Sequence, residues 1–171
     1  LLLPQTPDMR QLMRADLQKL FALMKTQGEA RGMFDYVTTG AAGGYSHSRS
    51  QYAVMGVWAA AQYGLEIPEN FWLITEQAWL DHQDASGGWA YKKKPTEAYP
   101  VSAGMTAVGI ATLFITQEYL HANEGIACKG NPRSEPIERG FKWITDNFEA
   151  FEADRLHQPD QRPETPIKKH P

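Results

Sequence analysis

Two kinds of apolar segment alternate along the chain. Residues 9–26 place apolar side chains on one stripe of a helix and basic ones largely opposite, and amphipathic segments of the same kind begin at Pro68 and near Ser134. Between them, residues 48–63 and 101–119 are apolar around almost their whole circumference, and each contains a single charged residue. Helices of this second kind are expected to be buried on most sides. The pattern predicts an all-α fold of five helices in the order amphipathic, buried, amphipathic, buried, amphipathic.

The second amphipathic helix ends in the segment Gln83-Asp84-Ala85-Ser86-Gly87-Gly88-Trp89. The two glycines permit the turn that a helix end needs to reverse direction. Trp89 supplies a large ring that can pack over this turn, and the side-chain amide of Gln83 can bond loose backbone groups. We therefore interpret Gln83, Gly87, Gly88 and Trp89 as structural residues.

The ends of the amphipathic segments recur along the sequence. Gln27 and Gln83 close similar segments 56 residues apart, and Asn147 closes a third one 64 residues after Gln83. A unit of one buried and one half-exposed helix needs its neighbours to complete a core. We therefore expect two layers of helices, with the buried ones inside. The residues that align between the first two units are Phe34-Asp35-Tyr36 with Trp89-Ala90-Tyr91, and Ala53-Val54 with Ala107-Val108.

The sequence Gln83…Gly87-Gly88-Trp89, placed between an outer and an inner helix, resembles the QW-type motif of the terpenoid cyclase and protein prenyltransferase superfamily, whose repeat is also called the prenyltransferase and squalene oxidase repeat. The resemblance covers residues of about 9–150. The first copy has Gly32-Met33-Phe34 in place of Gly-Gly-Trp, and the third keeps only its helix. The resemblance implies an α/α toroid of concentric inner and outer helices.

The resemblance also suggests how the chain is divided. Residues 1–156 are expected to form about two and a half helix pairs of a larger ring, and residues 157–171 a Pro-rich, charged tail or loop. Leu1-Leu2-Leu3 resembles the end of a preceding inner helix. A further inner helix is expected to begin near Lys168, where the sequence stops.

The composition argues against several classes of binding partner. The net charge is −3 and the 17 basic residues are scattered, which argues against binding to nucleic acid or to an anionic membrane surface. No apolar run approaches the length of a membrane span. The single cysteine, Cys128, excludes an internal disulfide and a cysteine-based metal cage, and favours a reducing, cytoplasmic location.

The motifs that carry chemistry in the family do not occur in this segment. Squalene and hopene cyclases protonate an alkene with an Asp-x-Asp-Asp motif, and protein prenyltransferases bind zinc through aspartate, cysteine and histidine. The sequence has no Asp-x-Asp-Asp, and its five histidines lack ligand spacing. The nearest acidic pair, Asp81 and Asp84, lies on an outer-helix turn. We therefore expect no metal and no cofactor. Asp35 and His47 are the candidates for proton transfer, and each can also be interpreted as a loop residue.

In toroids of this family the central cavity opens beside the N-termini of the inner helices. The simpler interpretation makes Ser48 and Ser102 helix caps and Tyr52 a core residue. Aromatic side chains such as Trp58 and Phe114 fit both carbocation stabilisation and ordinary packing. The residues predicted to line the cavity are Tyr45, Ser48, Gln51 and Tyr52 at the first inner helix, and Tyr99, Ser102 and Met105 at the second.

The resemblance implies a squalene- or terpenoid-cyclase-like helical-repeat protein that acts on an isoprenoid or lipid in a central cavity. If the protein is an enzyme, its activity is expected to be that of an isomerase or cyclase, or prenyltransferase-like. Its expected partners are a hydrophobic small molecule and the remainder of its own toroid. Two alternatives stay open, a non-catalytic helical-repeat binding scaffold and a carbohydrate-processing α/α-barrel protein.

Overall fold

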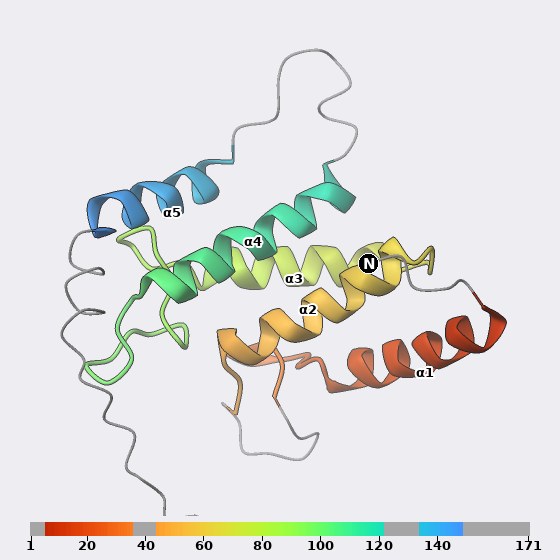
Figure 1. Cartoon of the computed structure of the whole chain (residues 1–171). Helices are drawn as coiled ribbons and strands as arrows, with labels where there is room; N and C mark the ends of the chain where they lie inside the picture. Colours follow the sequence, from red (N-terminus) through yellow and green to blue (C-terminus); the bar gives the residue numbers. More distant parts are fainter. Residues whose placement is uncertain (1–5, 36–43, 122–133, 149–171) are drawn as a thin grey trace, which may run out of the picture.

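A computed structural model describes residues 6–35, 44–121 and 134–148 (Figure 1). Within these ranges the chain forms five α-helices and a single 3-10 turn, and no strands, so the expected all-α fold is confirmed. Cys128, Leu1-Leu2-Leu3 and the predicted tail 157–171 lie outside the described residues. The elements are α1 (Pro7–Leu23), η1 (Gly28–Ala30), α2 (His47–Gln62), α3 (Glu69–Asp81), α4 (Ala103–Leu120) and α5 (Glu135–Asp146).

Serine caps fix where the two apolar helices begin. The side chain of Ser46 accepts a hydrogen bond from the Arg49 N–H (3.3 Å), and that of Ser102 accepts one from the Met105 N–H (3.4 Å). The interpretation of Ser102 as a cap is therefore confirmed. The interpretation of Ser48 as a cap is wrong, because the extended backbone that precedes the helix is at Ser46 and Ser48 lies inside the first turn.

The two apolar helices, α2 and α4, pack on each other (Figure 1). Each amphipathic helix packs on one of them, α1 on α2, and both α3 and α5 on α4. Two clusters of buried side chains hold the helices together. The first cluster contains Leu17, Phe34, Ala53, Val54, Val57, Ala60, Leu65, Phe71 and Trp72. The second contains Met33, Tyr45, Ala78, Trp79, Trp89, Ile110, Leu113 and Ile137.

Each apolar helix leaves one face open. Tyr52 and Met55 on α2 are 69% and 47% exposed, and Phe114 on α4 is 51% exposed. One open face on each helix is compatible with the predicted burial on most sides, and Phe114 is flanked there by Phe141 of α5, with the ring centroids 6.3 Å apart. The interpretation of Tyr52 as a core residue is wrong, because its side chain lies on the open face of α2. No helix in the described part of the chain has the length and apolar character needed to cross a membrane.

The Gln83 motif ties the end of α3 to the start of α5. The side-chain amide of Gln83 donates to the carbonyl oxygens of Gly87 (2.7 Å) and Pro136 (2.8 Å), and its oxygen accepts from Arg139. Gly87 has a φ of 100°, which favours glycine, and a Cβ there would lie 2.8 Å from the Arg139 oxygen. The loop can approach α5 this closely only because the turn residue has no side chain.

Trp89 is fully buried between three helices. Its indole N–H donates to the Trp79 carbonyl at the end of α3 (2.9 Å), and its backbone N–H donates to the Thr106 hydroxyl on α4 (3.1 Å). Glycines let both neighbouring helices approach the ring: a Cβ at Gly109 on α4 would lie 2.3 Å from the indole, and one at Gly140 on α5 would lie 3.1 Å from it. These are the contacts of a packing residue.

The loop after α1 is built in the same way. The backbone N–H of Phe34 donates to the Ser50 hydroxyl (3.0 Å), as that of Trp89 donates to Thr106 (3.1 Å). In both units the hydroxyl group stands on the fourth residue after the serine cap, and a glycine with positive φ, 82° or 100°, precedes the aromatic residue. The predicted alignment of Phe34 with Trp89 is therefore confirmed.

The two apolar helices align with an offset of 56 residues, from cap Ser46 to cap Ser102. The predicted alignment of Ala53-Val54 with Ala107-Val108 is two residues out of register, because Ala53 is buried and Ala107 is exposed. In the observed register five buried positions of α2 pair with buried positions of α4, and the exceptions are His47 with Ala103 and Gly56 with Thr112. The pairs are Ser50 with Thr106, Ala53 with Gly109, Val54 with Ile110, Val57 with Leu113, and Ala60 with Thr116.

Candidate functional site

The loop after α1 lies against the C-terminal half of α3. Its turn residue, Gly32, has a φ of 82°, and a Cβ there would lie 2.7 Å from Cβ of Ala78. The turn is closed by backbone bonds from the Lys25 N–H to the Met33 oxygen (2.9 Å) and from the Gly32 N–H to the Lys25 oxygen (2.8 Å). This packing brings the backbone of residues 28–31 next to the end of α3.

Two buried histidines meet at this junction. His47, the first residue of α2, and His82, the C-cap of α3, are 0% and 2% exposed. Nε2 of His47 lies 2.8 Å from Nδ1 of His82. The outer nitrogens reach backbone carbonyls: Nδ1 of His47 lies 2.6 Å from the Ala90 oxygen, and Nε2 of His82 lies 2.9 Å from the Glu29 oxygen. The two rings thus connect four separate parts of the chain.

Tyr45 contacts the histidine pair and also binds Glu29. Its hydroxyl donates to the Glu29 carboxylate (2.8 Å), and its ring lies against His82 with the ring centroids 5.4 Å apart. This hydrogen bond lowers the pKa of Glu29. Burial raises the pKa of Tyr45, and the hydrogen bond to Glu29 raises it further. At neutral pH, Tyr45 is therefore a hydrogen-bond donor and Glu29 is a carboxylate.

Burial also changes the acidity of the two imidazoles. Loss of solvent is the largest cause that lowers the pKa of His47, and the repulsion by His82 adds to it. The pKa of His82 is lowered mainly by burial as well, partly offset by the hydrogen bond to the Glu29 carbonyl. The arrangement can hold and exchange protons between two rings that are almost fully buried.

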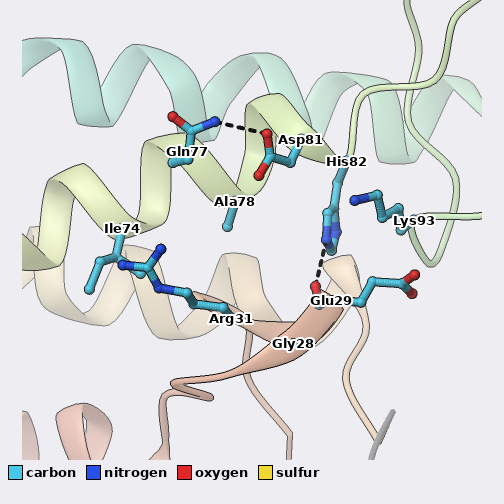
Figure 2. A pocket seen from close by; sticks show the side chains of 9 residues that line it. All are labelled: Gly28, Glu29, Arg31, Ile74, Gln77, Ala78, Asp81, His82 and Lys93. Atoms are coloured by element: carbon cyan, nitrogen blue, oxygen red, sulfur yellow. Dashed lines mark hydrogen bonds between the residues drawn. The ribbon is translucent and has the colours of Figure 1, made fainter.

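An open pocket of about 200 Å³ lies beside His82 (Figure 2). Figure 2 shows His82 and its bond to the Glu29 carbonyl at one side of the pocket and the Arg31 side chain at the other. Both signs of charge are present in the lining, so the pocket suits a polar ligand rather than an apolar one. The lining residues are Gly28, Glu29, Arg31, Ile74, Gln77, Ala78, Asp81, His82 and Lys93.

The two proton-transfer candidates have different surroundings. Asp35 accepts a hydrogen bond from the Arg49 guanidinium (2.7 Å), so it forms an ion pair at the start of α2. His47 belongs to the buried pair described above, and it is a helix residue rather than a loop residue. Proton transfer by either residue stays a prediction.

The residues predicted to line a central cavity are not gathered in one place. Tyr45 belongs to the histidine site, whereas Ser48 and Gln51 are half-buried on α2, and Tyr52 is exposed. At the other helix, Tyr99 is 56% exposed and stacks on Tyr91, Ser102 caps α4, and Met105 packs against the second core cluster. The pocket in Figure 2 contains none of these seven residues in its lining, so their role at a cavity stays a prediction.

Sequence reasoning missed His82 and Glu29. His82 directly precedes the motif residue Gln83, and the sequence gives no spacing that pairs it with His47, 35 residues away. Glu29 enters the site through its backbone carbonyl as well as its carboxylate. A carbonyl is common to all residues, so no residue pattern marks it.

The described residues contain no group of three or more His, Cys, Asp or Glu side chains that could hold a metal ion. No protein-family model, no curated protein and no solved structure matches this chain.

Proposed function

We propose that this chain is a segment of a terpenoid-cyclase-like α/α toroid, with α1, α3 and α5 as outer helices and α2 and α4 as inner ones. The observation that carries the proposal is the joint between outer and inner helix, which is built twice with the same hydrogen bond and five shared buried positions. Units that repeat in this way stack with a constant geometry. The family resemblance implies that this stack closes into a ring.

The function that we propose is the binding of an apolar small molecule, an isoprenoid or another lipid, on the open face of the inner helix α2. Tyr52 and Met55 supply an aromatic and a thioether group there, and they are 69% and 47% exposed. Exposed apolar side chains gathered on one face mark interaction sites, and aromatic rings can stabilise cations that form during terpenoid cyclisation. A catalytic acid would come from another part of the ring.

A non-catalytic scaffold is the second candidate, and one observation favours it. Trp58 lies on the side of α2 that packs against α4, and its indole N–H donates to Glu118 (3.0 Å). Phe114 occupies the corresponding position of α4, 56 residues later, and is 51% exposed. A further helix of the same kind would cover Phe114 as α4 covers Trp58. The open face of α4 would then be a protein interface rather than a lipid site.

Calorimetric titration with farnesol, compared with 1-dodecanol, tests the binding of an isoprenoid. We expect farnesol to bind more tightly. The Met55→Glu variant should weaken that binding by about tenfold, because a carboxylate replaces an apolar contact. Leu73→Glu is the matched control, since Leu73 is a similarly exposed residue (50%) on the outer helix α3.

The two variants separate the two candidates. Equal weakening by both substitutions would show that binding does not take place on the inner face. If neither alcohol binds, the proposed ligand is wrong, and the scaffold becomes the better candidate. Conversion of squalene into cyclic products by the intact protein would extend the proposal from binding to catalysis.

A further inference from the structure

The three contacts of the histidine pair fix where its protons are. A carbonyl oxygen accepts hydrogen bonds and cannot donate them. Nδ1 of His47 must therefore carry a proton toward the Ala90 oxygen (2.6 Å), and Nε2 of His82 must carry one toward the Glu29 oxygen (2.9 Å). A neutral imidazole has a single N–H. In a neutral pair both protons are thus used at the outer ends.

The inner contact then decides the charge of the pair. Nε2 of His47 and Nδ1 of His82 are 2.8 Å apart, a hydrogen-bond distance. In a neutral pair two lone pairs would face each other there, and in a doubly charged pair two N–H groups would. We infer that the folded protein holds one shared proton between these two nitrogens, so that His47 and His82 form a buried site for a single proton.

Two aromatic rings beside the pair favour a positive charge. The centroid of the Trp79 ring lies 4.9 Å from that of His47, and the centroid of the Tyr45 ring lies 5.4 Å from that of His82. The face of an aromatic ring attracts a cation at such distances. The rings therefore compensate in part for the solvent that the imidazoles have lost.

Three charged groups act on the pair from the elements around it. The carboxylates of Glu29, on the loop after α1, and Asp81, at the end of α3, favour the proton, and Lys93, on the loop before α4, opposes it. Burial lowers the pKa of both imidazoles and opposes the first charge as well, and the repulsion between the rings opposes a second one further. The requirement for one proton comes from the three hydrogen-bond contacts, and the surroundings oppose a second proton more strongly than the first.

The shared proton links the pocket to pH. His82 holds the Glu29 carbonyl, and Glu29 and His82 both line the pocket. When the proton leaves at higher pH, lone pairs face each other at 2.8 Å and the rings must move apart. The start of α2 and the pocket wall at Glu29 are then no longer linked through the two histidines. We expect the wall to loosen once the pH rises past the point at which the pair loses this proton.

Imidazole nitrogen-15 NMR on the full chain tests this inference directly, between about pH 5 and 6, where ordinary imidazoles are mostly charged. We expect protons on Nδ1 of His47 and Nε2 of His82, and one proton shared by the inner nitrogens, with a coupling across the bond. His121, outside the pair, serves as the internal control. Two neutral rings without a shared proton, or two fully charged rings, would overturn the inference.

The pH dependence of the unfolding free energy measures how many protons the folded pair holds. In the unfolded chain both imidazoles have a pKa near 6.5 and bind two protons by about pH 5. The folded pair holds one, so the unfolded state binds one proton more and stability falls as the pH is lowered through this range. The reference is the His47→Asn, His82→Gln double variant, whose amides keep the outer donors and do not titrate.

The slope of the unfolding free energy against pH should be steeper in the wild type than in the double variant, by the amount that corresponds to one bound proton. An excess of two protons means a neutral folded pair, and no excess means a doubly charged one; either result contradicts the inference. In a His121→Gln background, the same comparison with and without the His47→Asn, His82→Gln changes should retain the one-proton excess. If the double variant does not fold, the NMR measurement on the wild-type chain decides the question by itself.

Discussion

The loop after α1 and the loop after α3 make the same connection with side chains of different size. Phe34 fills the first joint, and Trp89 fills the second. The larger ring gains a hydrogen bond to the Trp79 carbonyl (2.9 Å), and it faces Gly109 where the first unit has Ala53. The larger ring is therefore paired with the smaller helix residue.

The two loops also differ in what holds them to the next outer helix. The second loop is held by Gln83, whose amide donates to the Pro136 carbonyl (2.8 Å) and does not titrate. The first loop is held by His82, whose ring bonds the Glu29 carbonyl (2.9 Å) and can change its charge. The first joint also borders the charged pocket. One joint is thus purely structural, and its counterpart adds a pH-sensitive group to the same construction.

The largest expected effect is at Trp89. Trp89→Ala should lower the unfolding free energy by about 3–5 kcal/mol, because it empties a fully buried site between three helices. Phe34→Ala should lower it by about 1 kcal/mol less, because a phenylalanine has no N–H to lose. Chemical denaturation with circular dichroism measures both. Leu73→Ala, at a position 50% exposed, is the control and should change stability by less than about 1 kcal/mol. An equally small change for Trp89→Ala would contradict its place in the core.

Hydrophobic periodicity was enough to predict the five helices and the repeat, because both depend on local patterns. It gave the wrong register for the apolar helices, since alanine and valine occur at exposed and buried positions alike, as Ala107 and Ala53 show. It also suggested, wrongly, that Tyr52 is a core residue. An apolar circumference shows that a helix can be covered, whereas the open face at Tyr52 depends on which neighbours are present.

The candidate site was harder to predict than the fold. His47 was singled out from its position before a helix, but its partner His82 comes from the end of another helix. The contact between the two histidines depends on how the loop after α1 packs on α3. Two of the three hydrogen bonds of the pair end on backbone carbonyls. The spacing of side chains in the sequence indicates neither the packing of this loop nor the carbonyl partners.

The size relation between the two joints can be tested by exchanging their residues. Gly109→Ala should destabilise the protein by about 1–3 kcal/mol, because the new Cβ would lie 2.3 Å from the Trp89 ring. In the Trp89→Phe background the same substitution should cost less, by about 1 kcal/mol or more, since the smaller ring leaves room as Phe34 does beside Ala53. A double-mutant cycle by chemical denaturation gives the coupling. Independent, additive effects would show that ring size and the glycine are unrelated.

The smallest expected effect compares the two glutamines that define the repeat in the sequence. Gln83→Ala should lower stability by about 1–2 kcal/mol, because the Gly87 and Pro136 carbonyls lose their shared donor. Gln27 stands at the corresponding place in the first unit but is exposed, so Gln27→Ala should change stability by less than about 0.5 kcal/mol. Thermal unfolding of the two variants under one condition makes the comparison. Equal losses would mean that Gln27 anchors its loop as Gln83 does, and that His82 is not the group that replaced it.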